Sequence, residues 1–502
     1  MSGTVTDALA HWARERPEHI AIDFAGEVIG YRELNDWADR VALDLRTRGV
    51  APGDRVSVLG VNSLEWCAAA LGAWRAGAIV APFNQRMLAG ELAGLVAACE
   101  PRVIYCDADL ESRLPADAAF SVARFERDVA PLRGVPGGSV KLAGDGPDEA
   151  AIVFTSGTTG KPKGVVFTHS RMAALFHDWS LVESVPPNGL RVLMVLPLFS
   201  AAGVIWGIAR TVLNGGTMLL QPGFDPAAAL RVLVRDRVNT FTGPPILWER
   251  IAALPEFAGA ELAHLTTAHV GGARVPPELL RRWAPRGVVL RQLYGQTEIG
   301  GSVTVTPPRA ALAKPETCGS GTVFSTIRVV DPDGVDCAPG APGEILLRGP
   351  GMMAGYWRDP EATAATIVDG WLRTGDLGTL DAEGDLTFVD RLKDLIISGG
   401  LNIAPAEVEA VVQTMPGVEE VAVISVPDEK FGETPAALVR AAAAITERDI
   451  VEYCAARLAD YKVPRYVVLC AEPLPRMASG KIAKRELREA YTDVPERFSR
   501  VR

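Results

Sequence analysis

Residues 155–164 read TSGTTGKPKG and follow a strand pattern, AAIVFT, at 150–155. The ten residues include three glycines, four hydroxyl side chains and two lysines. Glycine lets the backbone turn tightly and direct N–H groups at an anion, hydroxyl groups donate to phosphate oxygens, and lysine adds positive charge. The spacing is not that of a Walker A loop. The stretch therefore predicts a phosphate-binding loop that follows a strand, with an ordinary solvated turn as the alternative.

The segments before this loop alternate between strand and helix patterns. Short apolar runs at 55–60, 78–83 and 102–106 are typical of strands, and the longer segments 31–48 and 63–77 are typical of helices. This alternation favours parallel sheets covered by helices. We therefore predict an α/β fold with layered sheets for the large N-terminal part of the chain.

The pattern changes twice towards the C-terminus. From about residue 319, strand patterns such as TIRVVD, GEILLRG and LTFVD are separated by Gly, Pro and Asp turns, which indicates a small β-rich subdomain. After Asp390, helix and strand patterns return. We predict a large domain over 1–390, a hinge at 391–394 and a small α+β domain over 395–502.

Composition excludes several classes of protein. The 502 residues are 48% hydrophobic and 22% charged, which excludes disorder or a coiled coil as the main architecture. The net charge is −10 and no basic run is present, so we expect no nucleic-acid partner. The seven cysteines are widely spaced and contain no CxxC pair, which argues against a disulfide framework or a zinc site.

One uncharged segment, 192–209, has about the length of a membrane span. Pro197 interrupts it early, and Gly203 and Gly207 weaken it as a single helix. We predict a buried strand, a turn and a buried helix. The N-terminus has no apolar signal-peptide core, so we expect a cytoplasmic protein without an integral membrane segment.

Four further segments follow the loop in a fixed order: YGQTE at 294–298, GWLRTGDLG at 370–378, DRLKDLIISGGLNIAP at 390–405 and PRMASGK at 475–481. Together with the loop they resemble the signature motifs of the adenylate-forming enzymes. That superfamily contains acyl- and aryl-CoA synthetases, adenylation domains of peptide synthetases and beetle luciferases. The resemblance extends from the first expected helix to about Leu487.

The resemblance implies an acid:CoA ligase that uses ATP, Mg²⁺ and coenzyme A. ATP would convert a carboxylic acid to acyl-AMP with release of pyrophosphate, and the thiol of CoA would then take the acyl group. The small C-terminal domain would rotate between the two half-reactions. A homodimer is left open, and a carrier protein is the less favoured partner.

Catalytic roles follow from the same resemblance. Glu298 and Thr155 would hold Mg²⁺, and Thr297 would contact the α-phosphate. Lys481 would neutralise the reacting carboxylate and phosphate, and Lys393 would be the hinge residue. Further ATP- and AMP-binding residues would be Ser156, Gly157, Thr158, Thr159, Lys163, Gly271, Gly272, Ala273, Tyr294, Gly295, Asp376 and Arg391.

The acid and CoA sites are implied in the same way. Ser200 stands where many members of the family have a histidine that gates the acid site, which predicts a more open pocket. Because an unpaired second charge is costly in apolar surroundings, we expect a hydrophobic monocarboxylate, aliphatic or aromatic, and we expect Trp206 in the core. The acid pocket would comprise Phe199, Ser200, Gly203, His269, Val270 and Ile299. CoA would meet Gly399, Gly400, Lys430, Phe431 and Lys462.

Three alternatives stay open. A stand-alone activating enzyme could pass the acyl group to a carrier-protein pantetheine or to an amine. A binding protein could hold acyl-AMP without turnover, although Lys481, Glu298 and Asp376 argue against it. A phosphotransferase would release ADP instead of AMP.

The role of the C-terminal lysine can be tested by separating the half-reactions. We expect Lys481→Ala to abolish adenylation, because the two reacting anions lose their shared counter-charge. Thioester formation from supplied acyl-AMP should be largely intact. Pyrophosphate release and CoA consumption, measured separately, check this. An equal loss in both would contradict the assignment.

Overall fold

A computed structural model of the chain describes residues 3–116, 119–135, 148–155, 162–183, 185–186, 189–441, 445–477 and 482–502. The chain divides into two units, which are Met1–Ile327 with Leu347–Leu372, and Arg328–Leu346 with Arg373–Arg502. This division groups part of the expected β-rich subdomain with the C-terminal residues. The domain boundary and hinge at 391–394 therefore stay a prediction.

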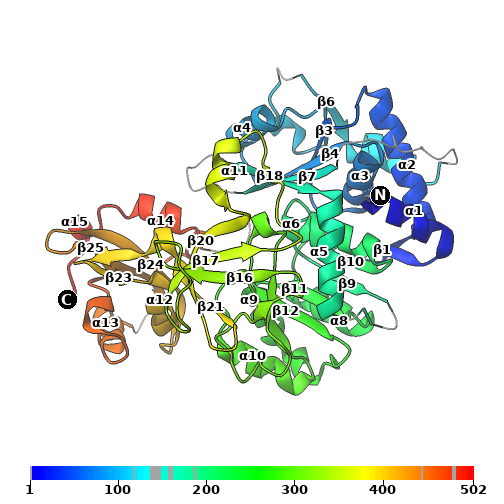
Figure 1. Cartoon of the computed structure of the whole chain (residues 1–502). Helices are drawn as coiled ribbons and strands as arrows, with labels where there is room; N and C mark the ends of the chain where they lie inside the picture. Colours follow the sequence, from blue (N-terminus) through cyan, green and yellow to red (C-terminus); the bar gives the residue numbers. More distant parts are fainter. Residues whose placement is uncertain are drawn as a thin grey trace. The chain divides into compact units, whose positions relative to one another are not determined.

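The first sheet of the larger unit is built mainly from parallel strands (Figure 1). Its strands are β1 (Ile20–Phe24), β2 (Glu27–Gly30), β9 (Arg191–Met194), β10 (Thr217–Leu220), β11 (Thr240–Gly243), β12 (Thr267–Gly271) and β13 (Leu290–Leu293). They lie in the order β13-β12-β11-β9-β10-β1-β2. Only the edge strand β2 is antiparallel to its neighbour, so the other strands all end at the same edge.

The second sheet contains the strand that precedes the predicted phosphate-binding loop. Its strands are β3 (Arg55–Leu59), β4 (Ile79–Phe83), β5 (Val103–Cys106), β6 (Ser121–Arg124), β7 (Glu149–Thr155), β8 (Lys163–Thr168) and β18 (Gly355–Tyr356), in the order β18-β8-β7-β4-β3-β5-β6. From β7 to β6 they run parallel, while β8 and β18 are antiparallel to their neighbours. The strand predicted at 150–155 corresponds to β7, and the α/β fold class is confirmed.

Helices connect these strands and cover the sheets. They are α1 (Val5–Glu15), α2 (Tyr31–Thr47), α3 (Leu64–Arg75), α4 (Ala89–Cys99), α5 (His169–Val182), α8 (Pro226–Arg235), α9 (Pro245–Ala252), α10 (Pro277–Trp283) and α11 (Pro360–Thr366). The expected helices at 31–48 and 63–77 correspond to α2 and α3 within three residues at each end. Ser63 caps α3, because its side chain accepts a hydrogen bond from the Trp66 N–H.

The uncharged segment at 192–209 forms the predicted strand, turn and buried helix. The strand is β9, and the helical part runs through α6 (Ala201–Gly203), η4 (Val204–Ala209) and α7 (Arg210–Leu213). The η4 segment is a π-helical turn that is buried throughout. Among the described residues, no helix is both long enough and apolar enough to cross a membrane.

A dense aromatic core lies between the first sheet and helices α8, α9 and α10. Trp248 and Trp283 are fully buried there, with ring centroids 4.7 Å apart and planes at 81°. Trp248 also packs on Phe241 of β11 at 4.7 Å. On the other face of this sheet, Trp179 of α5 meets Trp206 of η4 at 5.0 Å. Trp206 lies in the core, as expected.

Two smaller sheets complete this part of the fold. The strands of the larger one are β16 (Thr326–Val330), β17 (Gly343–Arg348), β19 (Ile367–Val368), β20 (Trp371–Leu380) and β21 (Leu386–Arg391). They lie in the order β16-β17-β20-β19, with β21 also paired to β20. In the other sheet, β14 (Thr304–Val305) is antiparallel to β15 (Ser320–Gly321).

The C-terminal residues form their own α+β arrangement. The strands are β22 (Ile396–Ser398), β23 (Leu401–Ile403), β24 (Val418–Asp428), β25 (Gly432–Ala441) and β26 (Tyr466–Leu469), and the helices are α12 (Pro405–Gln413), α13 (Glu447–Ala455), α14 (Lys484–Ala490) and α15 (Val494–Arg497). Two hydrophobic clusters lie on opposite faces of this sheet, because successive residues of β24 contribute to them alternately.

The aromatic core should dominate the stability of the larger unit. Trp283→Ala removes a side chain that fills space between α9, α10 and the sheet, so we expect a loss of about 3–5 kcal/mol. Leu312→Ala is the control, because Leu312 is half exposed and should cost under about 0.5 kcal/mol. Urea denaturation followed by circular dichroism measures both. Equal midpoints for the two variants would contradict this packing.

Candidate functional site

The predicted phosphate-binding loop joins two strands that pair with each other. β7 ends at Thr155 and β8 begins at Lys163, and these two residues are register partners. The Thr155 hydroxyl donates to the Lys163 carbonyl oxygen at 3.4 Å. The hairpin thus places both ends of the loop side by side. The loop residues Ser156, Gly157, Thr158 and Thr159 lie outside the described residues, as does Lys481.

Tyr356 connects this hairpin to Glu298. Strand β18 pairs with β8, which sets Tyr356 opposite Val165. The Tyr356 hydroxyl donates to Glu298 Oε1 at 3.0 Å, and Lys163 Nζ lies 4.7 Å from the Tyr356 ring centroid. Burial and the Glu298 charge raise the pKa of the Tyr356 hydroxyl, so it stays protonated and remains a donor. Sequence reasoning missed Tyr356, because it comes 58 residues after Glu298.

The motif YGQTE begins directly after β13. The backbone N–H of Tyr294 donates to Thr304 Oγ1 at 2.8 Å, and the Tyr294 side chain is largely buried. At Gly295 a Cβ would collide with the carbonyl oxygen of Gly301, so only glycine fits. Thr297 and Glu298 lie in the short η7 turn (Thr297–Ile299).

The GGA segment lies beside this motif. β12 and β13 are parallel, and Gly271 is the register partner of Leu293, the residue before Tyr294. A Cβ at Gly271 would lie 2.7 Å from the Leu293 carbonyl oxygen, and Gly272 has a φ of +78°. Both positions therefore favour glycine. The structure brings 271–273 and 294–298 together at the carboxyl edge of the sheet, where open α/β sheets bind ligands.

The smaller unit pairs two of the predicted nucleotide-binding residues. Asp376 of β20 and Arg391 of β21 are register partners, and Arg391 Nε lies 3.6 Å from Asp376 Oδ1. Asp376 is largely buried, while Arg391 and Lys393 are exposed. Lys393 lies in the η8 turn (Leu392–Asp394).

The residues expected at the CoA site are partly assembled. Gly399 and Gly400 form the turn between β22 and β23, and the Gly399 N–H donates to the Phe431 carbonyl oxygen at 2.8 Å. Asp428 Oδ1 accepts from the backbone N–H groups of Lys430 and Phe431, both at 3.0 Å. These contacts bring two of the expected segments side by side.

The Lys462 side chain is paired with a different residue, Glu407. Its Nζ lies 2.8 and 2.7 Å from the two carboxylate oxygens of Glu407. Its positive charge is therefore already neutralised. Binding of a phosphate there would compete with this ion pair.

The residues expected at the acid pocket do not share one surface. Val270 packs into the aromatic core, whereas His269 is fully buried on the other face of β12 beside Trp179. Ser200 caps α6, since its Oγ accepts from the Gly203 N–H at 3.2 Å. The remaining members differ in exposure: Phe199 is half-buried, and Gly203 and Ile299 are buried.

The larger unit provides ligands that suit Mg²⁺. The Glu298 carboxylate and the Thr155 hydroxyl are hard oxygen donors. In the described ranges, no cluster of three or more His, Cys, Asp or Glu side chains could hold a metal ion by itself.

Comparisons with known proteins cover both units. Residues 9–357 match the family described as AMP-binding enzyme, and residues 407–481 match the AMP-binding enzyme C-terminal domain. A feruloyl-CoA synthase from Amycolatopsis sp is 37% identical, over 95% of this chain and 97% of that protein. The long-chain-fatty-acid–CoA ligase FadD13 of Mycobacterium tuberculosis is 37% identical, over 92% of this chain and 93% of that protein.

A solved structure extends the likeness to three dimensions. The o-succinylbenzoate CoA synthetase MenE from Bacillus subtilis, in complex with its acyl-adenylate intermediate, superposes with a TM-score of 0.87. The two proteins are 28% identical, and the match covers 96% of this chain and 97% of that one.

Proposed function

The chain belongs to the AMP-binding enzyme family of adenylate-forming proteins, and from this premise we propose that it acts as an AMP-forming acid:CoA ligase. It activates a carboxylic acid with ATP to acyl-AMP, releases pyrophosphate, and transfers the acyl group to the thiol of CoA. Similarity over nearly the whole chain to acyl- and aryl-CoA ligases carries this conclusion.

The first half-reaction requires two anions to approach each other. The acid is already a carboxylate at pH 7, so it attacks the α-phosphorus without a general base. The barrier comes mainly from charge repulsion and is lowered by donors and cations fixed in advance. We assign this role to Lys163, Thr297 and Lys481.

Glu298 and Thr155 are the residues that would hold Mg²⁺, which supplies positive charge at the phosphate oxygens when bound. The protein's own contribution is to fix Glu298. The Tyr356 hydroxyl binds one carboxylate oxygen, and the Met353 N–H donates to the Glu298 carbonyl at 2.8 Å. The first contact restricts the carboxylate itself, and the second fixes the backbone from which it extends, before any substrate binds.

The smaller unit contains the residues that we assign to the ribose, the hinge and the pantetheine arm. Asp376 would accept hydrogen bonds from the two ribose hydroxyls, and Arg391, 3.6 Å away, would contact the same sugar. Lys393 is the proposed hinge residue. Gly399, Gly400 and Phe431 are the proposed neighbours of the pantetheine arm, since Gly399 already contacts Phe431 and Gly400 follows it in the same turn.

A hydrophobic monocarboxylate is the proposed acid. The segments expected around it are rich in buried apolar side chains, in which a second carboxylate would be poorly compensated. Feruloyl and long-chain fatty acyl groups, which the names of the two relatives specify, are of this kind. Transfer to a carrier protein or an amine remains the alternative for the second step.

The proposed function is tested by a panel of aliphatic and aromatic acids with Mg·ATP, with and without CoA. We expect pyrophosphate release with the preferred acids and, when CoA is present, acyl-CoA and AMP by mass spectrometry. Acyl-AMP that persists in the presence of CoA would move the second step to a carrier protein or an amine. ADP as product would overturn the assignment.

The hydrogen bond to Glu298 has a separate, measurable effect. Tyr356→Phe removes one donor to a carboxylate, which is worth about 1.4 kcal/mol at a partly exposed site, or tenfold in an equilibrium constant. We therefore expect the Mg²⁺ concentration for half-maximal pyrophosphate release to rise roughly tenfold.

Tyr453→Phe is the matched control, because it also removes one tyrosine hydroxyl. The Tyr453 hydroxyl donates to the Thr414 carbonyl oxygen, which belongs to the smaller unit. Thermal unfolding of both variants separates a loss of stability from a loss of positioning. An unchanged Mg²⁺ dependence in Tyr356→Phe would show that Tyr356 does not position Glu298.

A further inference from the structure

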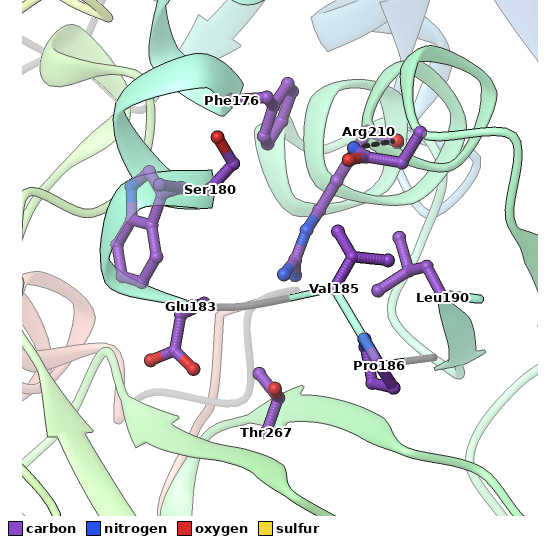
Figure 2. A pocket seen from close by; sticks show the side chains of 10 residues that line it. Phe176, Ser180, Glu183, Val185, Pro186, Leu190, Arg210 and Thr267 are labelled. Atoms are coloured by element: carbon purple, nitrogen blue, oxygen red, sulfur yellow. Dashed lines mark hydrogen bonds between the residues drawn. The ribbon is translucent and has the colours of Figure 1, made fainter. Parts of the chain in front are cut away.

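A second group of charged side chains is buried in the larger unit, away from the phosphate-binding hairpin. A cavity of about 10 Å³ lies there between α5, α7 and the start of β12 (Figure 2). A space of this size accommodates about one water-sized particle. The residues that decide its chemistry are Ser180, Glu183, Arg210, Asn214 and Thr267.

Arg210 is the cation that faces this cavity. Its relative exposure is 7%, and Figure 2 shows its guanidinium reaching into the cavity towards Glu183. The guanidinium carbon lies 5.4 Å from the Trp206 ring centroid. In the part of the chain that the structure describes, the guanidinium forms no hydrogen bond and no ion pair, and Glu183 acts on it only at longer range. Burial lowers the pKa of Arg210 to about 10, so it remains charged at neutral pH.

Glu183 is already engaged by other partners. Its Oε1 accepts from His269 Nε2 at 3.1 Å and forms an ion pair with Arg291. Burial would raise the pKa of Glu183, but His269, Arg291 and Arg210 lower it overall, so the carboxylate is ionised. One carboxylate thus faces two guanidinium groups.

His269 adds no compensating charge. Burial lowers the pKa of its imidazole, and its Nδ1 has no hydrogen-bond partner among the described residues. The ring is therefore neutral, with Nε2 donating to Glu183. The group formed by Glu183, Arg210, Arg291 and His269 carries a net charge of +1, and a buried uncompensated charge is strongly unfavourable.

We propose that the cavity binds a small monovalent anion of the halide class, chloride in practice, which neutralises Arg210. The Thr267 hydroxyl and the Asn214 amide line the same cavity. The amide uses one N–H for the Arg210 carbonyl oxygen, at 2.8 Å, which leaves its second N–H to donate to an anion. A water molecule would fit but would leave the charge uncompensated. A carboxylate or phosphate group has several heavy atoms, so a monatomic anion, although somewhat larger than a water molecule, is the anion closest in size to the cavity.

This site is distinct from the proposed catalytic site. Thr267 is the first residue of β12 and Gly271 is the last, so the cavity and the carboxyl edge are separated by the length of the strand, about 13 Å at 3.3 Å per residue. The inference therefore does not depend on which acid the enzyme activates or on the acyl acceptor.

Thermal unfolding of the whole chain tests the site. We compare sodium chloride and sodium bromide with sodium gluconate at equal ionic strength. When the free anion concentration is ten times the dissociation constant, binding multiplies the equilibrium constant for folding by about 11. Chloride and bromide should therefore raise Tm by roughly 2 °C. Equal Tm values in the three salts would overturn the proposal.

Arg210→Met should remove this dependence, because it deletes the unpaired charge and keeps an apolar stem of similar length. Arg282→Gln is the matched control, since Arg282 is exposed on α10, and it should keep the full halide effect. A halide effect of unchanged size in Arg210→Met would overturn the site. The same stabilisation by formate but not by bromide would overturn the halide assignment.

A second measurement does not depend on how the variants fold. Crystals of the unaltered chain grown in sodium bromide should show an anomalous peak beside the Arg210 guanidinium in the cavity. An anomalous signal confined to the surface, with no peak in the cavity, would contradict the proposal.

Discussion

The parallel pairing of β12 with β13 is the constraint on which the larger unit's site depends. Parallel strands end at one edge, so Gly271 and Leu293 are aligned and the segments that follow them lie side by side. The alignment also sets a steric requirement, because a Cβ at Gly271 would press on the Leu293 carbonyl oxygen and one at Gly295 would collide with Gly301. Glycine at these positions keeps the backbones close together at this edge, where we propose that the nucleotide binds.

The second sheet contributes to the same site because two antiparallel strands, β8 and β18, extend it beyond β7. β8 runs antiparallel to β7 on the other side of the predicted phosphate-binding loop, and β18 from a distant part of the sequence pairs with β8. That addition places Tyr356 where it reaches Glu298 and Lys163. The motif residue Glu298 is thus oriented by a tyrosine that lies outside the motif quoted around it.

Buried charge in this fold is handled in two different ways. Asp178 of α5 is fully buried, and it accepts hydrogen bonds from the Thr322 hydroxyl at 2.6 Å and the Phe324 N–H at 2.9 Å. Directly after the last residue of the same helix, Glu183 shares its charge between His269 and Arg291, which leaves Arg210 with the aromatic face of Trp206. The contrast explains why the second place, and not the first, calls for an additional anion.

The sequence by itself determined the α/β class, the family and the ligase chemistry. Motifs such as 155–164 and 294–298 are short continuous segments, so the residue types that characterise each motif can be recognised without the tertiary structure. The sequence also predicted that 192–209 forms a strand and a buried helix, since proline and glycine act locally. Only the tertiary structure decided that His269 and Val270 face opposite sides of β12, that Lys462 is paired with Glu407, and that Tyr356 holds Glu298. These contacts join residues from separate elements, and they depend on strand register and side-chain direction, which no single segment of sequence specifies.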